Sequence, residues 1–369
     1  MSDEGRAPGA VAPVGQPRSS YRRWGGRERE FVEVPLPPMR LVVPKGLSPE
    51  GERALQAALA RLATSKADNT LRAYRTDWSV WCHAAPILGV SPLPADPAGL
   101  AAFVSWLRDQ RNAEPATIRR RLAGIAWVHR LAGHPLDVRH PLVAGAVRGI
   151  AEEARPQRQA SALLLADIQK MLKKAGGGIA GLRNRAIILL GWAGALRRSE
   201  IVSLRADLPR RSDESWNHIE LRGEGLVVRL IRSKGERERP TEIGIPRGKG
   251  RDTCPVRAVE EWMRAADIRY GPLFVPVSAK GIPEPRALSG EAVRKMIKHV
   301  AGEAGIESTS LEPISAHSLR AGFITEAYKQ GIDDESIMGH SRHKDVSTMR
   351  RYVRRAKIVS GSVAGKLGL

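Results

Sequence analysis

Residues 337–355 read IMGHSRHKDVSTMRRYVRR. The stretch contains one tyrosine, Tyr352, closely flanked by arginines, namely Arg350, Arg351, Arg354 and Arg355. Because nearby positive charge favours the ionised form of an acid, this pattern predicts a phenol that ionises more easily than usual. The same guanidinium groups would attract a phosphate. A tyrosine on a basic helix is most often only a half-buried ring, so a phosphate site also requires suitable residues elsewhere in the chain.

Three upstream segments could supply them. In GALRRSE, residues 194–200, Glu200 follows Arg197 by three positions and could orient its guanidinium, although a surface ion pair is the commoner reading of this pattern alone. In SKGER, residues 233–237, Lys234 lies at a predicted β-turn, from which a lysine could protonate a leaving oxygen. In HSLRAGF, residues 317–323, His317 and Arg320 would project from one helix face.

Composition narrows the class of partner. The chain has 369 residues, with 60 Lys and Arg against 39 Asp and Glu, which gives a formal charge of +21. This excess predicts a polyanionic partner, with nucleic acid first and an anionic membrane surface second. No apolar run approaches the roughly 20 residues of a membrane-spanning helix, and the first residues lack a secretory core. Cys82 and Cys254 form no CxxC pair, so we expect neither zinc nor a disulfide framework, and we expect a cytoplasmic protein.

Hydrophobic periodicity divides the chain into three parts. Residues 1–46 are rich in Pro, Gly and Arg and predict a flexible basic arm, either merely solvated or touching DNA. Residues 47–155 predict a bundle of four or five helices, followed by an exposed linker, RPQRQ. Residues 160–369 predict further helices interrupted by short β-type runs over 218–246, which is typical of a small antiparallel sheet.

One predicted helix of the bundle, residues 115–133, has an arginine-rich face. Its apolar positions fall on one side, whereas three consecutive arginines, Arg119, Arg120 and Arg121, cover much of the rest. This face suggests a DNA-binding surface, and ordinary surface charge explains it equally well.

In chain order, these residues resemble the catalytic set of the tyrosine recombinases, the phage integrase family. The set consists of Arg197, Lys234, His317, Arg320, a late histidine and Tyr352. The sequence around these residues matches too, in GALRRSE, HSLRAGF and HKDVSTMRRYVR. The segment from about Asn69 to Glu153 also resembles the family's core-binding domain. The resemblance implies a mainly α fold with a small antiparallel β-sheet. It comprises an N-terminal core-binding, SAM-like bundle and a C-terminal mixed α/β catalytic domain.

Two histidines compete for the late position. Met338-Gly339-His340 imitates the family's usual Leu-Gly-His triplet, but the family's histidine usually precedes the tyrosine by nine positions. That spacing selects His343 and leaves His340 as a local or surface histidine. The chain then has Arg342 where the family usually has glycine.

The resemblance implies a role for each residue. Tyr352 would attack a DNA phosphate and form a covalent 3′-phosphotyrosine. Arg197, Arg320 and His343 would hold the non-bridging oxygens, with Glu200 bracing Arg197. Lys234 would protonate the leaving 5′ oxygen, and His317 would accept the phenol proton.

Cofactors and assembly follow from the same resemblance. No Mg²⁺-binding carboxylate cluster and no Walker-type loop is evident in the sequence, so neither a metal ion nor ATP is expected. Four protomers would hold two DNA duplexes and exchange strands through a Holliday junction, with a monomer or weak dimer in the absence of DNA. In the cell, the enzyme would lie on the nucleoid in the cytoplasm.

Two other functions remain open at this point. A type IB topoisomerase shares the chemistry but relaxes supercoils, and a non-catalytic architectural protein would bind DNA without cutting it. The sequence does not specify the target site, the mobile element or replicon, the accessory factors, or the roles of the N-terminal arm and the C-terminal tail.

Overall fold

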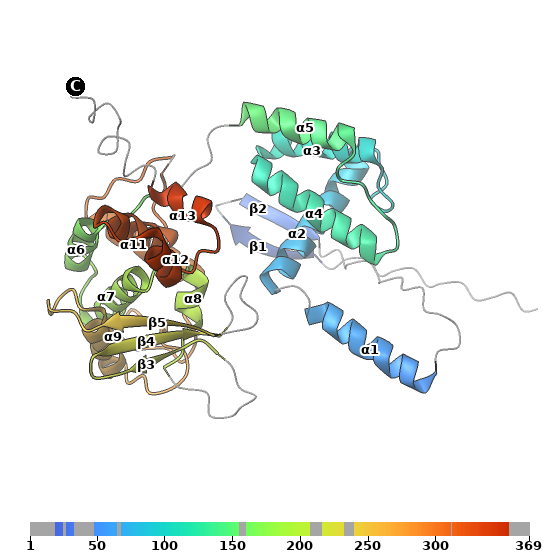
Figure 1. Cartoon of the computed structure of the whole chain (residues 1–369). Helices are drawn as coiled ribbons and strands as arrows, with labels where there is room; N and C mark the ends of the chain where they lie inside the picture. The colour runs from blue at the N-terminus through green and yellow to red at the C-terminus, as the bar shows by residue number, and fades with distance from the viewer. Residues whose placement is uncertain are drawn as a thin grey trace, which may run out of the picture. The chain divides into compact units, whose positions relative to one another are not determined.

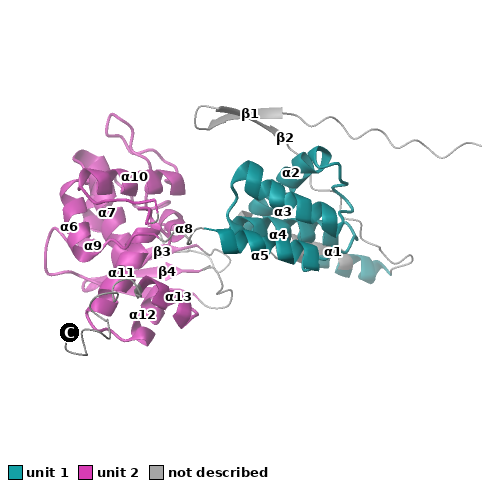
Figure 2. Ribbon diagram, turned by 90° about the horizontal axis from the view of Figure 1, so that it is seen from above, with its two compact units in different colours: residues 1–155 teal, residues 156–369 magenta. Residues whose placement is uncertain are grey.

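A computed structural model of the chain describes residues 19–24, 27–32, 48–64, 68–154, 160–206, 216–231, 240–310 and 312–353 (Figure 1). The chain divides into two compact units, residues 1–155 and residues 156–369 (Figure 2). None of the described helices is both long enough and apolar enough to cross a lipid bilayer.

The first unit is a helical bundle. Its helices are α1 (Pro49–Thr64), α2 (Asp68–Ile87), α3 (Pro97–Arg111), α4 (Pro115–Leu131) and α5 (Pro141–Glu153). Helix α2 packs on α4, and α3 packs on α5.

Local sequence signals set the ends of these helices. Asp96 caps α3, because its Oδ1 accepts a hydrogen bond of 2.8 Å from the amide of Gly99. Pro115 occupies the first turn of α4, where its missing N–H costs nothing. The apolar faces then meet around Trp81 and Phe103, which are fully buried and stack edge to face.

A short hairpin lies within the segment that was expected to form an N-terminal arm. Strands β1 (Ser19–Trp24) and β2 (Arg27–Val32) pair antiparallel, with Trp24 opposite Arg27. The sequence between them is Gly-Gly, a dipeptide that favours two-residue hairpin loops, and this signal was missed because the composition of the segment is low in apolar residues. The other residues of the predicted arm lie outside the described part of the chain.

The second unit combines helices with a three-stranded sheet. The strands are β3 (His218–Leu221), β4 (Gly225–Leu230) and β5 (Thr241–Pro246), antiparallel in the order β3-β4-β5. The helices are α6 (Leu165–Lys173), α7 (Gly178–Ala193), α8 (Arg198–Ser203), α9 (Pro255–Ala265), α10 (Gly290–Glu303), α11 (His317–Lys329), α12 (Asp334–Ser341) and α13 (Val346–Val353). The predicted mainly α fold with a small antiparallel sheet is confirmed.

Close packing of α11 positions the site. A side chain at Gly322 would collide with the carbonyl of Leu163, so α11 approaches the segment before α6 only because this residue is glycine. That segment is fixed from the other side, since the indole of Trp192 donates to the same Leu163 carbonyl at 2.9 Å. Helix α11 also lies against α7 and α13, and thereby joins the first arginine segment to the tyrosine segment.

Candidate active site

Helices α11 and α13 bring His317 and Tyr352 together. Nε2 of His317 lies 2.6 Å from the Tyr352 hydroxyl. Helix α13 is held there by apolar packing of Met349 against α11, and by a 3.2 Å hydrogen bond from the Thr325 hydroxyl to the Tyr352 carbonyl. The phenol and the imidazole are therefore adjacent because two helices pack, although their residues lie 35 positions apart.

Arg320 is buried within the site. Its side chain is 1% exposed, and its Nη1 donates to the carbonyl of Ala195 at 2.7 Å. Its Nη2 lies 3.3 Å from the His343 ring. Burial, with Arg197 and Arg342 nearby, lowers the pKa of Arg320 to about 9. Within the described part of the chain no carboxylate forms an ion pair with this guanidinium, so it gains from a bound anion.

Arg197 is the N-terminal cap residue of α8, and Glu200 lies in the first turn of that helix. Glu200 accepts from the Arg197 backbone amide at 2.8 Å and from its Nη1 at 2.6 Å. The Arg197 side chain remains 26% exposed, so it is oriented by the carboxylate while still reaching solvent. Burial raises the pKa of Glu200, but Arg342 and Arg197 outweigh it, and the net pKa is lowered. Glu200 is therefore a carboxylate at neutral pH.

The two late histidines have different surroundings. His343 contacts Arg320 and accepts from or donates to the Ser341 hydroxyl at 2.8 Å, and its ring centroid is 5.7 Å from that of Tyr352. His340 instead stacks on Phe323 and lies 2.8 Å from the Ala193 carbonyl. Burial, Arg320 and Arg197 lower the pKa of His343 to about 3, so this ring is neutral.

The expectation of an easily ionised phenol was wrong. Burial raises the pKa of Tyr352 above its ordinary value and outweighs the lowering by Arg320 and Arg351. Arg350 is paired with Asp334 at 2.7 Å rather than with the phenol, whereas Arg354 and Arg355 lie outside the described residues. Sequence proximity overstated the role of Arg350 and Arg351, because Arg350 is engaged by Asp334 and Arg351 donates to the Thr348 hydroxyl at 3.1 Å.

His317 is better suited than the flanking arginines to activate this phenol. Desolvation, together with Arg320 and Arg197, lowers the pKa of His317, so its imidazole is neutral at pH 7. A neutral imidazole beside a protonated phenol is the arrangement from which a proton can be transferred.

Lys234 falls outside the described residues. It belongs to the connection between β4 and β5, which are paired antiparallel strands. No group of three or more His, Cys, Asp or Glu side chains able to hold a metal ion occurs within the described ranges.

The three arginines of α4 do not share one environment. Arg120 forms an ion pair with the buried Asp77, and Arg121 lies 4.0 Å from the same carboxylate with its side chain 18% exposed. Arg119 is exposed. Part of the predicted DNA-binding face is therefore engaged in holding α4 to α2.

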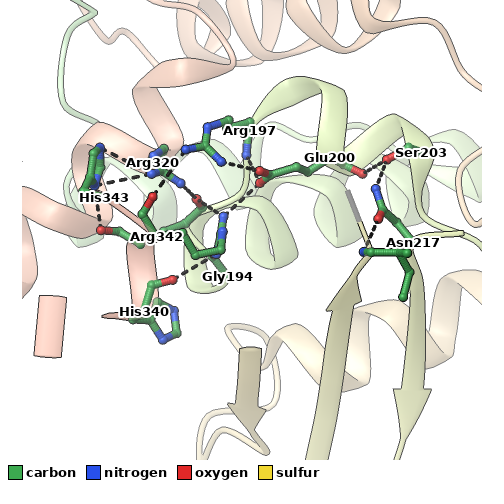
Figure 3. A network of polar contacts seen from close by, with 12 residues as sticks. Gly194, Arg197, Glu200, Ser203, Asn217, Arg320, His340, Arg342 and His343 are labelled. Carbon is green, nitrogen blue, oxygen red and sulfur yellow. Dashed lines mark hydrogen bonds and ion pairs between the residues drawn. The ribbon is translucent and has the colours of Figure 1, made fainter. Parts of the chain in front are cut away.

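Arg342 is the site residue that the sequence left unresolved. It caps the end of α12 in the left-handed conformation, with φ 58°, and its side chain is 1% exposed. It donates to Glu200 at 2.9 Å and to the Ala195 carbonyl at 3.0 Å (Figure 3). The only signal for it was an arginine at a position where the family usually has glycine.

Comparison with known sequences identifies the family. The sequence profile of the phage integrase family matches residues 162–358, which include the α8, α11 and α13 segments of this site. The chain belongs to the phage integrase family. Over 329 residues it is 31% identical to an integrase/recombinase xerD homolog of Selenomonas ruminantium, covering 86% of this chain and 90% of that protein. It is also 25% identical to the tyrosine recombinase XerD of Listeria monocytogenes, over 79% and 89% of the two chains.

Solved structures of integrases share the fold. A lambda integrase fragment, residues 75–356, in a dimer bound to a COC′ core site matches with a TM-score of 0.54 and 17% identity, over 82% of this chain and 94% of that one. The Tn1549 transposon integrase in complex with transposon right end DNA matches with a TM-score of 0.52 and 15% identity, over 83% and 97%. This phage integrase family member is a tyrosine-type site-specific recombinase, an enzyme that breaks and rejoins DNA.

Proposed function

We propose that this recombinase cuts DNA with Tyr352 and conserves the bond energy as a covalent 3′-phosphotyrosine. The observation that carries the proposal is the 2.6 Å approach of His317 to the Tyr352 hydroxyl. The Tyr352 oxygen forms a bond to phosphorus while the bond from phosphorus to the 5′ oxygen breaks. The phenol proton moves to His317, and the leaving 5′ oxygen takes a proton from Lys234. Attack by a 5′ hydroxyl on the phosphotyrosine reverses these steps and reseals the strand.

Three cationic or polar groups stabilise the phosphate in this proposal. Arg197 and Arg320 bind the non-bridging oxygens, on which negative charge grows as phosphorus becomes five-coordinate. His343, whose ring lies 3.3 Å from Arg320, adds a further hydrogen bond. Because a phosphodiester is exchanged for a phosphotyrosine ester of similar energy, the reaction needs neither a metal ion nor ATP.

The partner in this proposal is a recombination site in duplex DNA. The net charge of +21 supports it, as do the DNA complexes of the lambda and Tn1549 integrases. Four protomers on two duplexes would exchange strands in pairs through a Holliday junction, and the exchange would take place on the nucleoid, in the cytoplasm. The helical unit, with Arg119 exposed on α4, contributes part of the DNA-binding surface.

A nicked duplex tests this function. The DNA flanking the gene is footprinted to find the bound site, and that site is then made with a nick next to the cleavage point so that the released fragment diffuses away. The wild-type enzyme accumulates a covalent adduct with the labelled 3′ end, and Tyr352→Phe accumulates none. An adduct formed equally well by Tyr352→Phe would exclude this tyrosine as the nucleophile.

Two further measurements separate recombination from its rivals. Exchange of strands between two labelled duplexes supports the recombinase, whereas relaxation of supercoiled plasmid without exchange supports a topoisomerase. Tight binding to the footprinted site without any adduct would support an architectural protein.

A further inference from the structure

Arg342 occupies a backbone position that favours glycine. Its φ of 58° and ψ of 47° end α12 and turn the chain towards α13, which carries Tyr352. Side chains with a Cβ rarely adopt this left-handed conformation, which glycine enters freely. An arginine in such a turn carries a backbone cost that the contacts of its side chain must offset.

The side chain reaches from this turn into the first arginine segment. Its Nη1 donates to the carbonyls of Gly194 at 3.2 Å and His340 at 2.9 Å. Its Nη2 donates to the carbonyl of Ala195 and to Oε2 of Glu200. In Figure 3 the guanidinium lies among these groups, on the side of Glu200 away from Arg197. The planar guanidinium thus joins the segment before α13 to the turn between α7 and α8.

Both proposed phosphate-binding arginines are connected through these acceptors. Oε1 of Glu200 accepts from the Arg197 guanidinium and Oε2 accepts from the Arg342 guanidinium, so two cations share one buried carboxylate. The Ala195 carbonyl accepts from Arg320 at 2.7 Å and from Arg342 at 3.0 Å. The main-chain carbonyl of Arg342 accepts in turn from Nη2 of Arg197 at 3.4 Å.

The balance of charge around the Glu200 carboxylate affects how well Arg197 can bind a phosphate. A buried carboxylate paired with Arg197 alone would compete with a DNA phosphate for that guanidinium. The guanidinium of Arg342 shares the negative charge of Glu200. Glu200 can therefore orient Arg197 without keeping its positive charge from the DNA phosphate. Arg342 itself is too deeply buried to contact DNA, and so it acts through its neighbours.

We propose that Arg342 is a positioning residue that holds Arg197 and Arg320 ready for the scissile phosphate and leaves their charge available to it. The inference rests on the proposed function, in which those two arginines bind that phosphate. It adds a residue that does not touch the substrate to the machinery of strand cleavage.

The test is Arg342→Gly, which keeps the left-handed turn and removes only the side chain. Adduct formation is measured in single turnovers with saturating nicked duplex, on a scissile phosphodiester and on a matching neutral methylphosphonate. We expect the phosphodiester rate to fall by about ten-fold or more, short of the roughly 100-fold or greater loss for a direct oxyanion contact, with DNA affinity changed less than about two-fold. The loss should be much smaller on the methylphosphonate, which has less charge to neutralise.

A double-mutant cycle tests the route through Glu200. If Arg342 balances that carboxylate, Glu200→Gln in the Arg342→Gly background should cost much less than Glu200→Gln alone. Multiplicative losses would overturn the coupling, and equal losses on both substrates or wild-type cleavage by Arg342→Gly would overturn the positioning role. If the glycine variant does not fold, Arg342→Lys is measured on the same two substrates, and the same criterion of unequal or equal losses decides the outcome.

Two controls complete the design. Arg269→Gly removes one positive charge from a side chain that is 80% exposed and should leave both rates unchanged. If the wild-type enzyme forms no Tyr352-dependent adduct, the proposed function fails. If the wild-type adduct forms and Arg342→Gly matches it, only the role of Arg342 fails.

Discussion

The imidazole of His317 lies within hydrogen-bond distance of the Tyr352 hydroxyl, with 2.6 Å between Nε2 and the phenolic oxygen. Because the pKa of His317 is lowered and that of Tyr352 is raised, the pair holds its proton on the phenol at neutral pH. The structure is thus that of a resting pair, in which the histidine is free to accept the proton as the phenol attacks.

Removing this base should slow cleavage strongly. His317→Ala should lower the single-turnover rate of adduct formation by about 100-fold or more, the usual contribution of a positioned general base. The exposed His299 on α10 provides a matched control, and His299→Ala should cleave at the wild-type rate. A loss of less than about three-fold in His317→Ala would rule out this histidine as the main proton acceptor.

The pH dependence of cleavage has a defined sign. Since the pKa of His317 lies below its ordinary value of 6.5, the ring stays neutral at pH 7 and becomes protonated only as the pH falls further. At subsaturating DNA, where rates report the free enzyme, cleavage should hold down to about pH 6.5 and decline below it. The decline should be absent from the residual activity of His317→Ala. A decline that begins above pH 7 would contradict the lowered pKa.

The two late histidines should differ in their effect on chemistry. His343→Ala should lower the cleavage rate by about 10²-fold, because it removes a hydrogen-bond donor next to Arg320. His340→Ala should mainly lower the melting temperature, because it removes the stack on Phe323 and a contact with the Ala193 carbonyl. Single-turnover cleavage well below both melting temperatures separates the two effects, and the reverse ranking would reassign the late histidine to His340.

Glu200 should stabilise the fold in a pH-dependent way. Its pKa is lowered, so its contribution is complete above the ordinary value of 4.5 and disappears as the pH falls through the lowered value. At pH 7, Glu200→Gln should reduce the free energy of unfolding by about 3 kcal/mol, because two guanidinium groups lose their carboxylate. Denaturant unfolding should show the difference from wild type shrinking as the pH falls below 4.5. Glu291→Gln, which removes an exposed partner of Arg294, should change stability little at any pH.

Neighbouring arginines on α4 should contribute differently to DNA binding. Arg119→Ala should weaken binding to a non-specific duplex and reduce the slope of log affinity against log salt by about 0.9, the value for one phosphate contact. Arg121→Ala should leave that slope unchanged and lower the thermal stability, because Arg121 lies beside the buried Asp77. Equal slopes for wild type and Arg119→Ala would remove Arg119 from the DNA interface.

Much of the fold could be predicted from local patterns. The cap at Asp96, the proline at the start of α4 and the change to β-type periodicity after residue 218 are encoded by neighbouring residues, and the structure has the corresponding elements. The Gly-Gly hairpin of β1 and β2 was not predicted, because this segment lacks a clear hydrophobic periodicity and only its turn dipeptide indicates a hairpin.

The sequence by itself determined which catalytic residue types and motifs are present, and hence the family, because the letters of a motif and their spacing are properties of the linear chain. Only the tertiary structure decided which groups are buried together. Burial outweighs the flanking arginines at Tyr352 and reverses the predicted shift of its pKa. The Arg342 guanidinium meets Glu200 across 142 positions, a relationship that no spacing rule contains. The physical reason is that desolvation and long-range pairing depend on which helices pack, and packing is not a property of any local segment.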